Sequence, residues 1–257
     1  MSWIVLFVYY FATVTGMTYV ARIAPPDLFV VEVHEVYPHD SDSFTQGLVW
    51  YEGRFFESAG LRGESDIREV DPATGEVIRI QDLPSEIFAE GLALVDDRLI
   101  QITWQEFTAF AYDRDTFESV GEYSYDTEGW GLCYDGTRLV MSDGSATLFF
   151  RDPATFELIG SVNVVIAGQP QIYLNELECV NGKVYANVWT TDYIVIIEPS
   201  NGRIEGVIYA GELLTNEERA QSDVLNGIAY NPETERFYIT GKHWPKLFEV
   251  TFVEYQP

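Results

Sequence analysis

Short runs of alternating apolar and polar residues fill most of the chain, and turn-forming residues separate them. Such alternation is typical of strands with one buried face, and helical spacing is scarce apart from a turn near 216–220. The runs form a repeat, and each copy begins with a triplet that ends in Leu or Ile. The five triplets are Gln46-Gly47-Leu48, Glu90-Gly91-Leu92, Trp130-Gly131-Leu132, Asn175-Glu176-Leu177 and Asn226-Gly227-Ile228.

The spacing of the triplets predicts the fold. Their third residues are 44, 40, 45 and 51 positions apart. A period of roughly forty residues that contains several short strands is typical of a β-propeller with one blade per copy. An Asp-Pro-type turn also recurs between the third and fourth strands of four copies, at 71–75, 113–117, 152–156 and 198–202. We therefore predict an all-β fold, a five-bladed β-propeller.

The two ends of the repeat array are complementary. The fifth copy ends after its third strand, near residues 247–252, and an unmatched strand lies at 29–36. We expect the N-terminal strand to pair with the C-terminal blade, because this pairing closes the ring and leaves no exposed edge. Residues 27–257 are predicted to form this single domain.

The first 26 residues have a different character. Residues 2–14 are almost wholly apolar, and Pro25-Pro26 ends the segment. Residues 1–26 are typical of a signal peptide or a short membrane anchor, although no positive residue precedes the apolar run. An incorrectly assigned start codon is the alternative. We expect a protein exported to the periplasm or the outside of the cell, with no stable membrane partner unless this segment remains as an anchor.

The formal net charge is −26. A polyanion cannot bind nucleic acid by neutralising phosphates, so nucleic-acid partners are excluded. The charge either steers cationic substrates, such as peptides with free amino termini, or keeps the protein soluble, as in a saline habitat. The two cysteines, Cys133 and Cys179, fall near the inner strands of adjacent blades but are offset when counted from their triplets. We therefore expect two buried thiols rather than a disulfide.

Candidate chemistry lies at one mouth of the channel. The first two strands of a blade are antiparallel, so the start of the first meets the end of the second. The first strands begin with Gln46, Glu90, Trp130, Asn175 and Asn226. Counting fourteen residues onward, or sixteen in the last copy, gives Gly60, Trp104, Gly144, Trp189 and Lys242. Core packing would explain any one of these tryptophans, but three indoles around one carboxylate predict a small, partly dry pocket.

Other chemistries have little support in the sequence. The three histidines lack zinc-ligand spacing, and there is no Gly-x-Ser-x-Gly motif or phosphate-binding glycine loop. The segment 39–41, His-Asp-Ser, is interpreted as a structural loop rather than part of a catalytic triad.

Taken in order, several motifs resemble the plant and bacterial glutaminyl cyclases, or glutamine cyclotransferases, over residues 33–250. They are Phe44-Thr45-Gln46-Gly47-Leu48, Phe88-Ala89-Glu90-Gly91-Leu92-Ala93, Glu128-Gly129-Trp130-Gly131-Leu132, Leu174-Asn175-Glu176-Leu177-Glu178, Ala186-Asn187-Val188-Trp189, Leu225-Asn226-Gly227-Ile228-Ala229 and Thr240-Gly241-Lys242. The resemblance implies a five-bladed propeller that converts the N-terminal glutamine of peptides or proteins to pyroglutamate and releases ammonia, without cofactor or catalytic metal. Ala89 stands where the family usually has glycine.

The resemblance also implies roles for individual residues. Glu90 matches the essential glutamate of the family. The matching pocket residues are Phe44, Gln46, Trp104, Trp130, Asn175, Trp189 and Lys242. We add Asn226 as a substrate-binding residue from its place in the ring of strand starts, and we expect a monomer.

The chemistry of cyclisation suggests a mechanism. Glu90 can take a proton from the α-amine and deliver it to the departing amide nitrogen. Gln46, Asn175 or Lys242 would donate to the oxyanion, and the three tryptophans would hold the glutamine side chain folded.

Two other classes of function remain open. One is a metal-dependent, lactonase-like propeller hydrolase in which Glu90, Asn175 and Asn226 bind calcium, although three tryptophans suit such a site poorly. The other is a non-catalytic propeller that binds peptide ends, because a fold does not define an activity.

Overall fold

The computed structural model describes residues 9–14, 17–22 and 24–256, and these are almost entirely β-structure. The helix within the described residues, α1 (Asn216–Arg219), is capped at its N-terminus by Thr215. Thr215 accepts a hydrogen bond from the Glu218 backbone N–H, and the Glu218 side chain accepts one from the Thr215 backbone. This capping box explains why the predicted helical turn forms here.

Three antiparallel sheets contain four strands each, in chain order from the inside of the ring to the outside. The first contains β4 (Thr45–Tyr51), β5 (Arg54–Ala59), β6 (Asp66–Val70) and β7 (Val77–Asp82). The second contains β8 (Ala89–Val95), β9 (Arg98–Thr103), β10 (Thr108–Asp113) and β11 (Ser119–Ser124). The third contains β12 (Leu132–Tyr134), β13 (Leu139–Ser142), β14 (Thr147–Arg151) and β15 (Leu158–Asn163).

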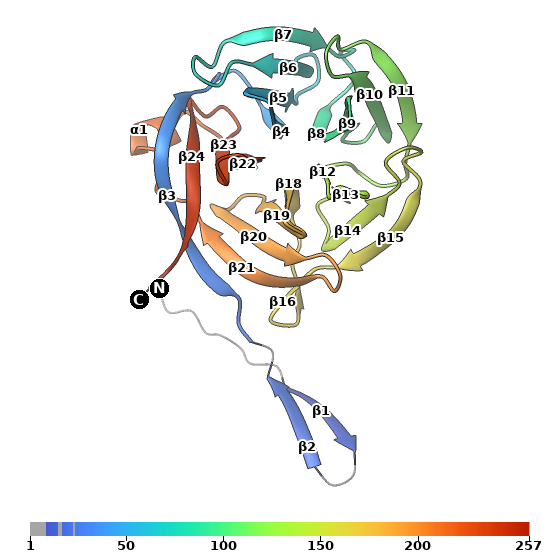
Figure 1. Ribbon diagram of the computed structural model, residues 1–257, viewed down its shortest axis with the longest axis vertical. Helices are drawn as coiled ribbons and strands as arrows, with labels where there is room; N and C mark the ends of the chain where they lie inside the picture. The colour runs from blue at the N-terminus through green and yellow to red at the C-terminus, as the bar shows by residue number, and fades with distance from the viewer. Residues whose placement is uncertain (1–8, 15–16, 23, 257) are drawn as a thin grey trace.

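The fourth sheet has ten strands. Its main path runs through β18 (Leu174–Val180), β19 (Lys183–Val188), β20 (Tyr193–Glu198), β21 (Arg203–Tyr209), β3 (Asp27–Pro38), β24 (Lys246–Glu254), β23 (Arg236–Gly241) and β22 (Leu225–Asn231). Two short strands, β16 (Val165–Ile166) and β17 (Gln169–Pro170), lie off this path. The sheets surround a common centre (Figure 1), so the fold is all-β and propeller-like.

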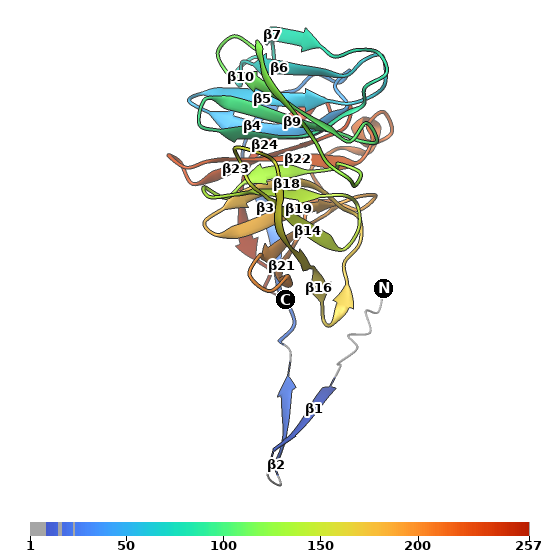
Figure 2. The same cartoon turned by 90° about the vertical axis from the view of Figure 1, so that its right-hand side faces the viewer.

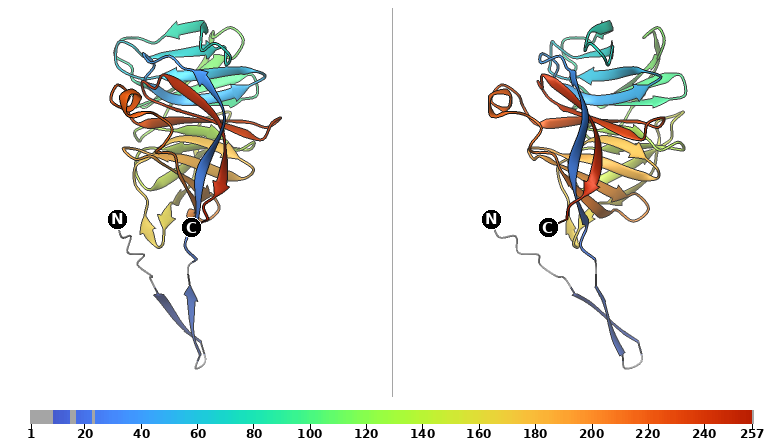
Figure 3. Two further views of the ribbon diagram at one scale, coloured as in Figure 1. Left: turned by 90° about the vertical axis from the view of Figure 1, so that its left-hand side faces the viewer. Right: turned by 60° about the vertical axis from the view of Figure 1, so that its left-hand side comes forward.

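Strand β3 closes the ring. It pairs antiparallel with β24, from Pro38 opposite Lys246 to Phe29 opposite Glu254. The start of β3 also pairs in parallel with β21. Figure 3 shows β3 and β24 side by side. The predicted pairing of the N-terminal strand with the last strand of the chain is therefore present, and it protects the edge that β24 would otherwise expose.

The four predicted Asp-Pro-type turns share one geometry. In each, the fifth residue donates its backbone N–H to the carbonyl of the first at 2.8 Å. The fifth residue has a positive φ, which suits Gly75 and Gly202 but strains Phe117 and Phe156. Both phenylalanine rings are fully buried, so packing offsets the strain.

Glycines of the triplets allow the innermost strands to approach one another. A Cβ at Gly47 would overlap the backbone of Leu92, and one at Gly91 would overlap that of Leu132. A Cβ at Gly131 would likewise overlap Asn175. Only glycine fits where two backbones come this close, which explains the glycine of these three triplets.

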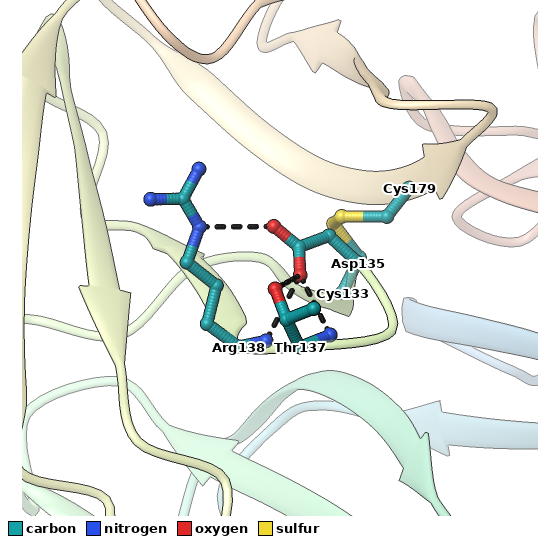
Figure 4. Close-up of a disulfide and its surroundings, with 5 residues drawn as sticks. All are labelled: Cys133, Asp135, Thr137, Arg138 and Cys179. Atoms are coloured by element: carbon teal, nitrogen blue, oxygen red, sulfur yellow. Dashed lines mark hydrogen bonds and ion pairs between the residues drawn. A yellow bond between two sulfur atoms is a disulfide. The ribbon is translucent and has the colours of Figure 1, made fainter.

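The expectation of free thiols is wrong, because Cys133 and Cys179 form a disulfide (Figure 4). Cys133 lies on β12 and Cys179 on β18, with their Cα atoms 5.5 Å apart. The predicted offset between the two cysteines assumed that residues at equal distances from their triplets lie at the same height in neighbouring inner strands. However, no hydrogen-bonded ladder joins β12 to β18, and the pairing of β18 with β19 shifts between Leu174 and Leu177. Counting from the triplets therefore misplaces Cys179.

The predicted signal peptide or anchor falls partly on residues 1–8, 15, 16 and 23, which lie outside the described residues. Within it, β1 (Tyr9–Val14) and β2 (Met17–Arg22) pair as a separate two-stranded sheet (Figure 2). In the described part of the chain, we find no helix with the length and apolar character that a membrane span requires.

A buried ion pair lies where the first sheet meets the end of the chain. The His39 ring has Nδ1 2.7 Å from the Trp244 carbonyl and Nε2 3.2 Å from Glu57 Oε1. Ser43 and Thr45 donate to the same carboxylate oxygen, each at 2.6 Å. Burial alone would raise the pKa of Glu57, but His39 outweighs it and lowers this pKa to about 2. Burial alone would lower the pKa of His39, but Glu57 and the Trp244 carbonyl raise it overall.

We expect the closing strand to be essential for stability. Removing residues 1–36 deletes most of β3 and leaves the backbone groups of β24 without partners, so the midpoint of thermal unfolding should fall sharply. Removing only residues 1–26 should leave it nearly unchanged. Equal thermal stability of the two truncated proteins would contradict this role of β3.

We also expect the ion pair to make stability depend on pH. The contribution of Glu57, whose pKa is lowered, is present above its unfolded value of 4.5 and is lost as the pH falls toward 2. The contribution of His39, whose pKa is raised, is complete below 6.5 and is lost as the pH rises through the raised value. Between these limits, His39→Gln should lower the free energy of unfolding in urea by about 3–5 kcal/mol.

The effect of His39→Gln should shrink toward both pH extremes. His34→Gln is the matched control, because His34 lies on β3 and its ring bonds Thr251 on the exposed face. That substitution should change stability little at any pH. An effect of His39→Gln that is constant from acid to alkaline pH would show that the ion pair is not its cause.

Candidate active site

Irregular pairing at the triplets directs the candidate residues toward the centre of the ring. The ladder shifts register at the triplet in β4, β8, β18 and β22. Such bulges re-aim side chains and are common next to active sites. The side chains carried by these irregular segments are all buried, namely Gln46, Glu90, Asn175 and Asn226.

Backbone hydrogen bonds join the ends of the second strands to the segments before the first strands. In four copies, the residue directly after the second strand donates its N–H to the carbonyl of the residue two places before the triplet. These bonds are Gly60 to Phe44 at 2.8 Å, Trp104 to Phe88 at 3.0 Å, Trp189 to Tyr173 at 2.9 Å and Lys242 to Val224 at 3.0 Å. The two predicted rings of residues therefore meet at one mouth of the channel.

Aromatic side chains form a nearly continuous wall around this mouth. Neighbouring rings meet edge to face at centroid distances between 5.4 and 6.1 Å. The pairs are His243 with Phe44, Phe44 with Phe88, Phe88 with Trp104, Trp130 with Trp189, and Trp189 with Tyr173. Trp189 is 36% exposed and Tyr173 is 44% exposed, so the wall reaches solvent on this side.

The two glycines of the predicted rings make room for the wall. A Cβ at Gly60 would lie 2.7 Å from the Phe88 ring and 3.0 Å from Gln46 Cγ. A Cβ at Gly144 would lie 2.6 Å from the Trp130 ring. Because these glycines have no side chain, the rings of Phe88 and Trp130 and the side chain of Gln46 can lie directly against their backbone.

Glu90 and Lys242 are the interacting buried charges of the site. Glu90 is 5% exposed, and its burial raises its pKa well above 4.5, as do the charges of Glu128 and Glu106. Lys242 opposes this shift. Burial lowers the pKa of Lys242, against the charges of Glu90 and Asp223. Its Nζ lies 4.4 Å from the centre of the Phe44 ring, a cation–π contact that helps to hold the ammonium.

Two of the predicted amides are coupled to each other. Asn226 Nδ2 donates to Gln46 Oε1 at 3.1 Å and to the Thr45 carbonyl at 2.9 Å. Gln46 therefore accepts through its oxygen and can offer its own N–H groups to a ligand. Asn226 is fully buried, and its two bonds fix the orientation of the Gln46 amide relative to β4. Asn175 is also buried, and its Oδ1 has no hydrogen-bond partner among the described residues.

Known proteins with similar sequences and structures share this architecture. A family model described as glutamine cyclotransferase matches residues 5–252. A glutaminyl-peptide cyclotransferase of Arabidopsis thaliana is 41% identical over 226 residues, which cover 86% of this chain and 70% of the plant protein. The crystal structure of Myxococcus xanthus glutaminyl cyclase matches with a TM-score of 0.82 and 39% identity, covering 90% of this chain and all of the bacterial one. This chain belongs to the glutamine cyclotransferase family.

Glu128 is a carboxylate of this site that was not predicted from the sequence of this cyclotransferase-family member. Glu128 Oε2 accepts from the indole nitrogens of Trp104 at 2.8 Å and Trp130 at 3.1 Å, and Glu128 Oε1 accepts from Gln105 at 2.8 Å. Burial alone would raise the pKa of Glu128, but these three hydrogen bonds lower it overall. Glu128 therefore stays ionised and fixes two of the three tryptophans.

The repeat itself carried a signal for the missed residues. Phe44, Phe88, Glu128 and Tyr173 each stand two places before the head of a triplet. Counting two residues back from the head of each triplet, in addition to fourteen residues forward, would have predicted Phe88 and Glu128 as residues of the site. In the described part of this family member, no group of three or more His, Cys, Asp or Glu side chains could hold a metal ion.

We expect the pKa of Glu90 to respond to its two charged neighbours in opposite directions. Glu128→Gln removes a negative charge and should lower this pKa, whereas Lys242→Met removes a positive charge and should raise it. Carbon-13 NMR of glutamate carboxyl groups can follow the titration, and Glu90→Gln assigns the resonance. Shifts in the same direction in both variants would contradict this electrostatic arrangement.

Proposed function

We propose that this protein is a glutaminyl-peptide cyclotransferase, which converts N-terminal glutamine of peptides or proteins to pyroglutamate, and that Glu90 moves the proton. Membership of the family, with 41% identity to the plant enzyme, supports the activity. One observation carries the role of Glu90. A buried carboxylate with a raised pKa lies in an aromatic pocket beside one buried ammonium group, and a raised pKa suits a group that must both accept and return a proton.

The reaction needs one proton to change place. The substrate α-amine attacks the side-chain carbonyl carbon, which forms the ring C–N bond and places negative charge on the oxygen. Glu90 takes a proton from the attacking nitrogen and delivers it to the amide nitrogen. The C–N bond to that nitrogen then breaks, and ammonia leaves. Glu90 ends the cycle ionised, so no other acid or base is consumed.

Donors near Glu90 can stabilise the oxyanion. Asn226 occupies the oxygen of Gln46, which leaves the Gln46 N–H groups for the substrate. The side-chain amide of Asn175 and the Lys242 ammonium are the other buried donors of the pocket. Donors fixed in a site that excludes water are worth far more than the same donors in solution.

The indoles hold the substrate in a folded conformation. Glutamine in solution is mostly extended, and cyclisation requires the amine and the carbonyl carbon to meet. Trp104 and Trp130 are both fixed by Glu128, and Trp189 packs edge-on against Trp130. Rigid walls of this kind lower the entropic cost of reaching the reactive geometry.

We infer that the ring has five blades. The ten-stranded sheet divides naturally between β21 and β3, where pairing is parallel, whereas pairing is antiparallel elsewhere along its main path. On this division, β18–β21 form one blade and β22, β23, β24 and β3 form another. Together with the three separate sheets they match the five triplets.

We also infer that the protein is exported and acts as a monomer. The disulfide between Cys133 and Cys179 supports export, because disulfides persist mainly in oxidising compartments. The apolar segment of residues 2–14 is consistent with it. A monomer suffices, because one chain supplies all the residues of the proposed site.

A calcium-dependent, lactonase-like activity is the second candidate. The buried Oδ1 atoms of Asn175 and Asn226 have no hydrogen-bond partner among the described residues, and amide oxygens are suitable calcium ligands. The aromatic wall favours cyclisation over this alternative. Turnover of Gln-initiated peptides that survives EDTA supports cyclisation, whereas loss restored by calcium supports the alternative.

We expect Glu90→Gln to lower kcat by about 100-fold or more, because an amide of similar size cannot accept and return a proton. Binding of the peptide should change far less. Mass spectrometry of a Gln-initiated peptide measures the reaction as the loss of one ammonia.

Two substrate controls accompany this test. An Asn-initiated peptide should not react, since its side chain is one methylene too short for the five-membered ring. An N-acetylated peptide should not react either, because its nucleophile is blocked. Near wild-type turnover by Glu90→Gln would remove Glu90 from the mechanism.

A further inference from the structure

One triplet breaks the pattern of the repeat at its middle position. Gly47, Gly91, Gly131 and Gly227 occupy this position in four copies, but Glu176 occupies it in the remaining copy, which is the fourth along the chain. Three of the glycines are required by the backbone of the neighbouring inner strand, as described above. A long side chain that ends in a carboxyl group, at the equivalent place in β18, therefore needs its own explanation.

The Glu176 carboxylate spans from β18 to two other inner strands. The side chain is 1% exposed. Its Oε2 accepts from the backbone N–H of Ile228 on β22 at 2.9 Å, and its Oε1 accepts from that of Leu48 on β4 at 3.4 Å. One side chain thus joins three inner strands that are not neighbours in a single ladder.

The two acceptor bonds fall at the irregular parts of β4 and β22. Leu48 and Ile228 are the third residues of the triplets that begin with Gln46 and Asn226. The regular ladders skip Gln46 in β4 and Asn226 and Gly227 in β22, so strand pairing alone does not fix them. The Glu176 bonds fix the residue that follows each irregular segment, and they add to the bonds that Asn226 makes to Gln46 and Thr45 and that the Gly227 N–H makes to Asn187.

We propose that Glu176 is a positioning residue of the active site, which fixes the triplets of β4 and β22 and so directs Gln46 and Asn226 to the pocket. Its neighbour Asn175 is fixed in the same step, because both lie in the irregular segment of β18. Glu176 does not touch the substrate. This inference rests on the proposed cyclotransferase activity for its kinetic consequence, but the structural consequence is independent of that activity.

Glu176→Gln tests the role with little change in size. The amide keeps one acceptor oxygen and turns its N–H₂ group toward the second backbone N–H, so one of the two bonds is lost. We expect kcat to fall by about 10- to 100-fold, because a displacement of about 1 Å can cost about 100-fold in rate. Glu176→Gly restores the pattern of the other copies, removes both bonds and should lower kcat further.

Glu178→Gln is the matched control. Glu178 lies on the same strand, and burial raises its pKa to about 8, although the backbone groups of Cys179 and Tyr230 oppose this shift. It therefore resembles Glu176 chemically, but its side chain makes no hydrogen bond to a triplet residue among the described residues. Glu178→Gln should lower the midpoint of thermal unfolding without changing kcat or KM.

Hydrogen exchange provides a readout that does not depend on turnover. In Glu176→Gln, the backbone amides of residues 46–48 and 226–228 should exchange at least about tenfold faster, with no comparable change in Glu178→Gln. Wild-type kcat in Glu176→Gln, or unchanged exchange at these amides, would overturn the proposal. Absence of turnover in the wild-type protein would instead refute the cyclotransferase activity, and the exchange data would still decide the role of Glu176.

Discussion

The hydrogen bonds between β3 and β24 are the constraint on which the rest of the structure depends. They hold the first strand of the ring against the last strand of the chain, and they complete the sheet whose inner strand carries Asn226. Asn226 in turn donates to Gln46 on β4, so one side of the pocket is assembled across the closure. The buried pair of His39 and Glu57 lies at the same junction. Closing the ring and completing the site are therefore a single structural event.

The site combines buried charge with rigid apolar walls. The mouth is lined by aromatic rings and contains three titratable side chains, Glu90, Lys242 and Glu128. Each of these side chains has a different set of contacts. Hydrogen bonds from Gln105 and two indoles lower the pKa of Glu128, whereas the Glu90 carboxyl has no such donor among the described residues and burial raises its pKa. Two carboxylates in one pocket thus acquire opposite pKa shifts from their surroundings, as expected where one is structural and the other transfers protons.

The repeat made much of this predictable. Counting from the triplets correctly predicted that Glu90, Trp104, Trp189 and Lys242 lie at one mouth. The count works because the first two strands of a sheet pair antiparallel, so a nearly constant number of residues separates the start of the first strand from the end of the second. The same counting failed for Cys133 and Cys179, since no ladder sets the phase between one sheet and the next. Glu128 and Glu176 were missed for other reasons. Glu128 stands two places before a triplet and was left out because the count ran forward from the triplets only. The role of Glu176 depends on backbone N–H groups of two other copies, which no local pattern encodes.

Closure by the first strand also has a consequence for how the chain folds. During synthesis β3 is the first strand of the ring to emerge, but its antiparallel partner β24 is almost the last segment to leave the ribosome. The three separate four-stranded sheets can form from local hairpins, whereas the ring must wait for the whole chain. Contacts between such distant segments make folding slow, and β3 stays unpaired with β24 in the meantime. A chain that must cross a membrane before it folds would benefit from this delay.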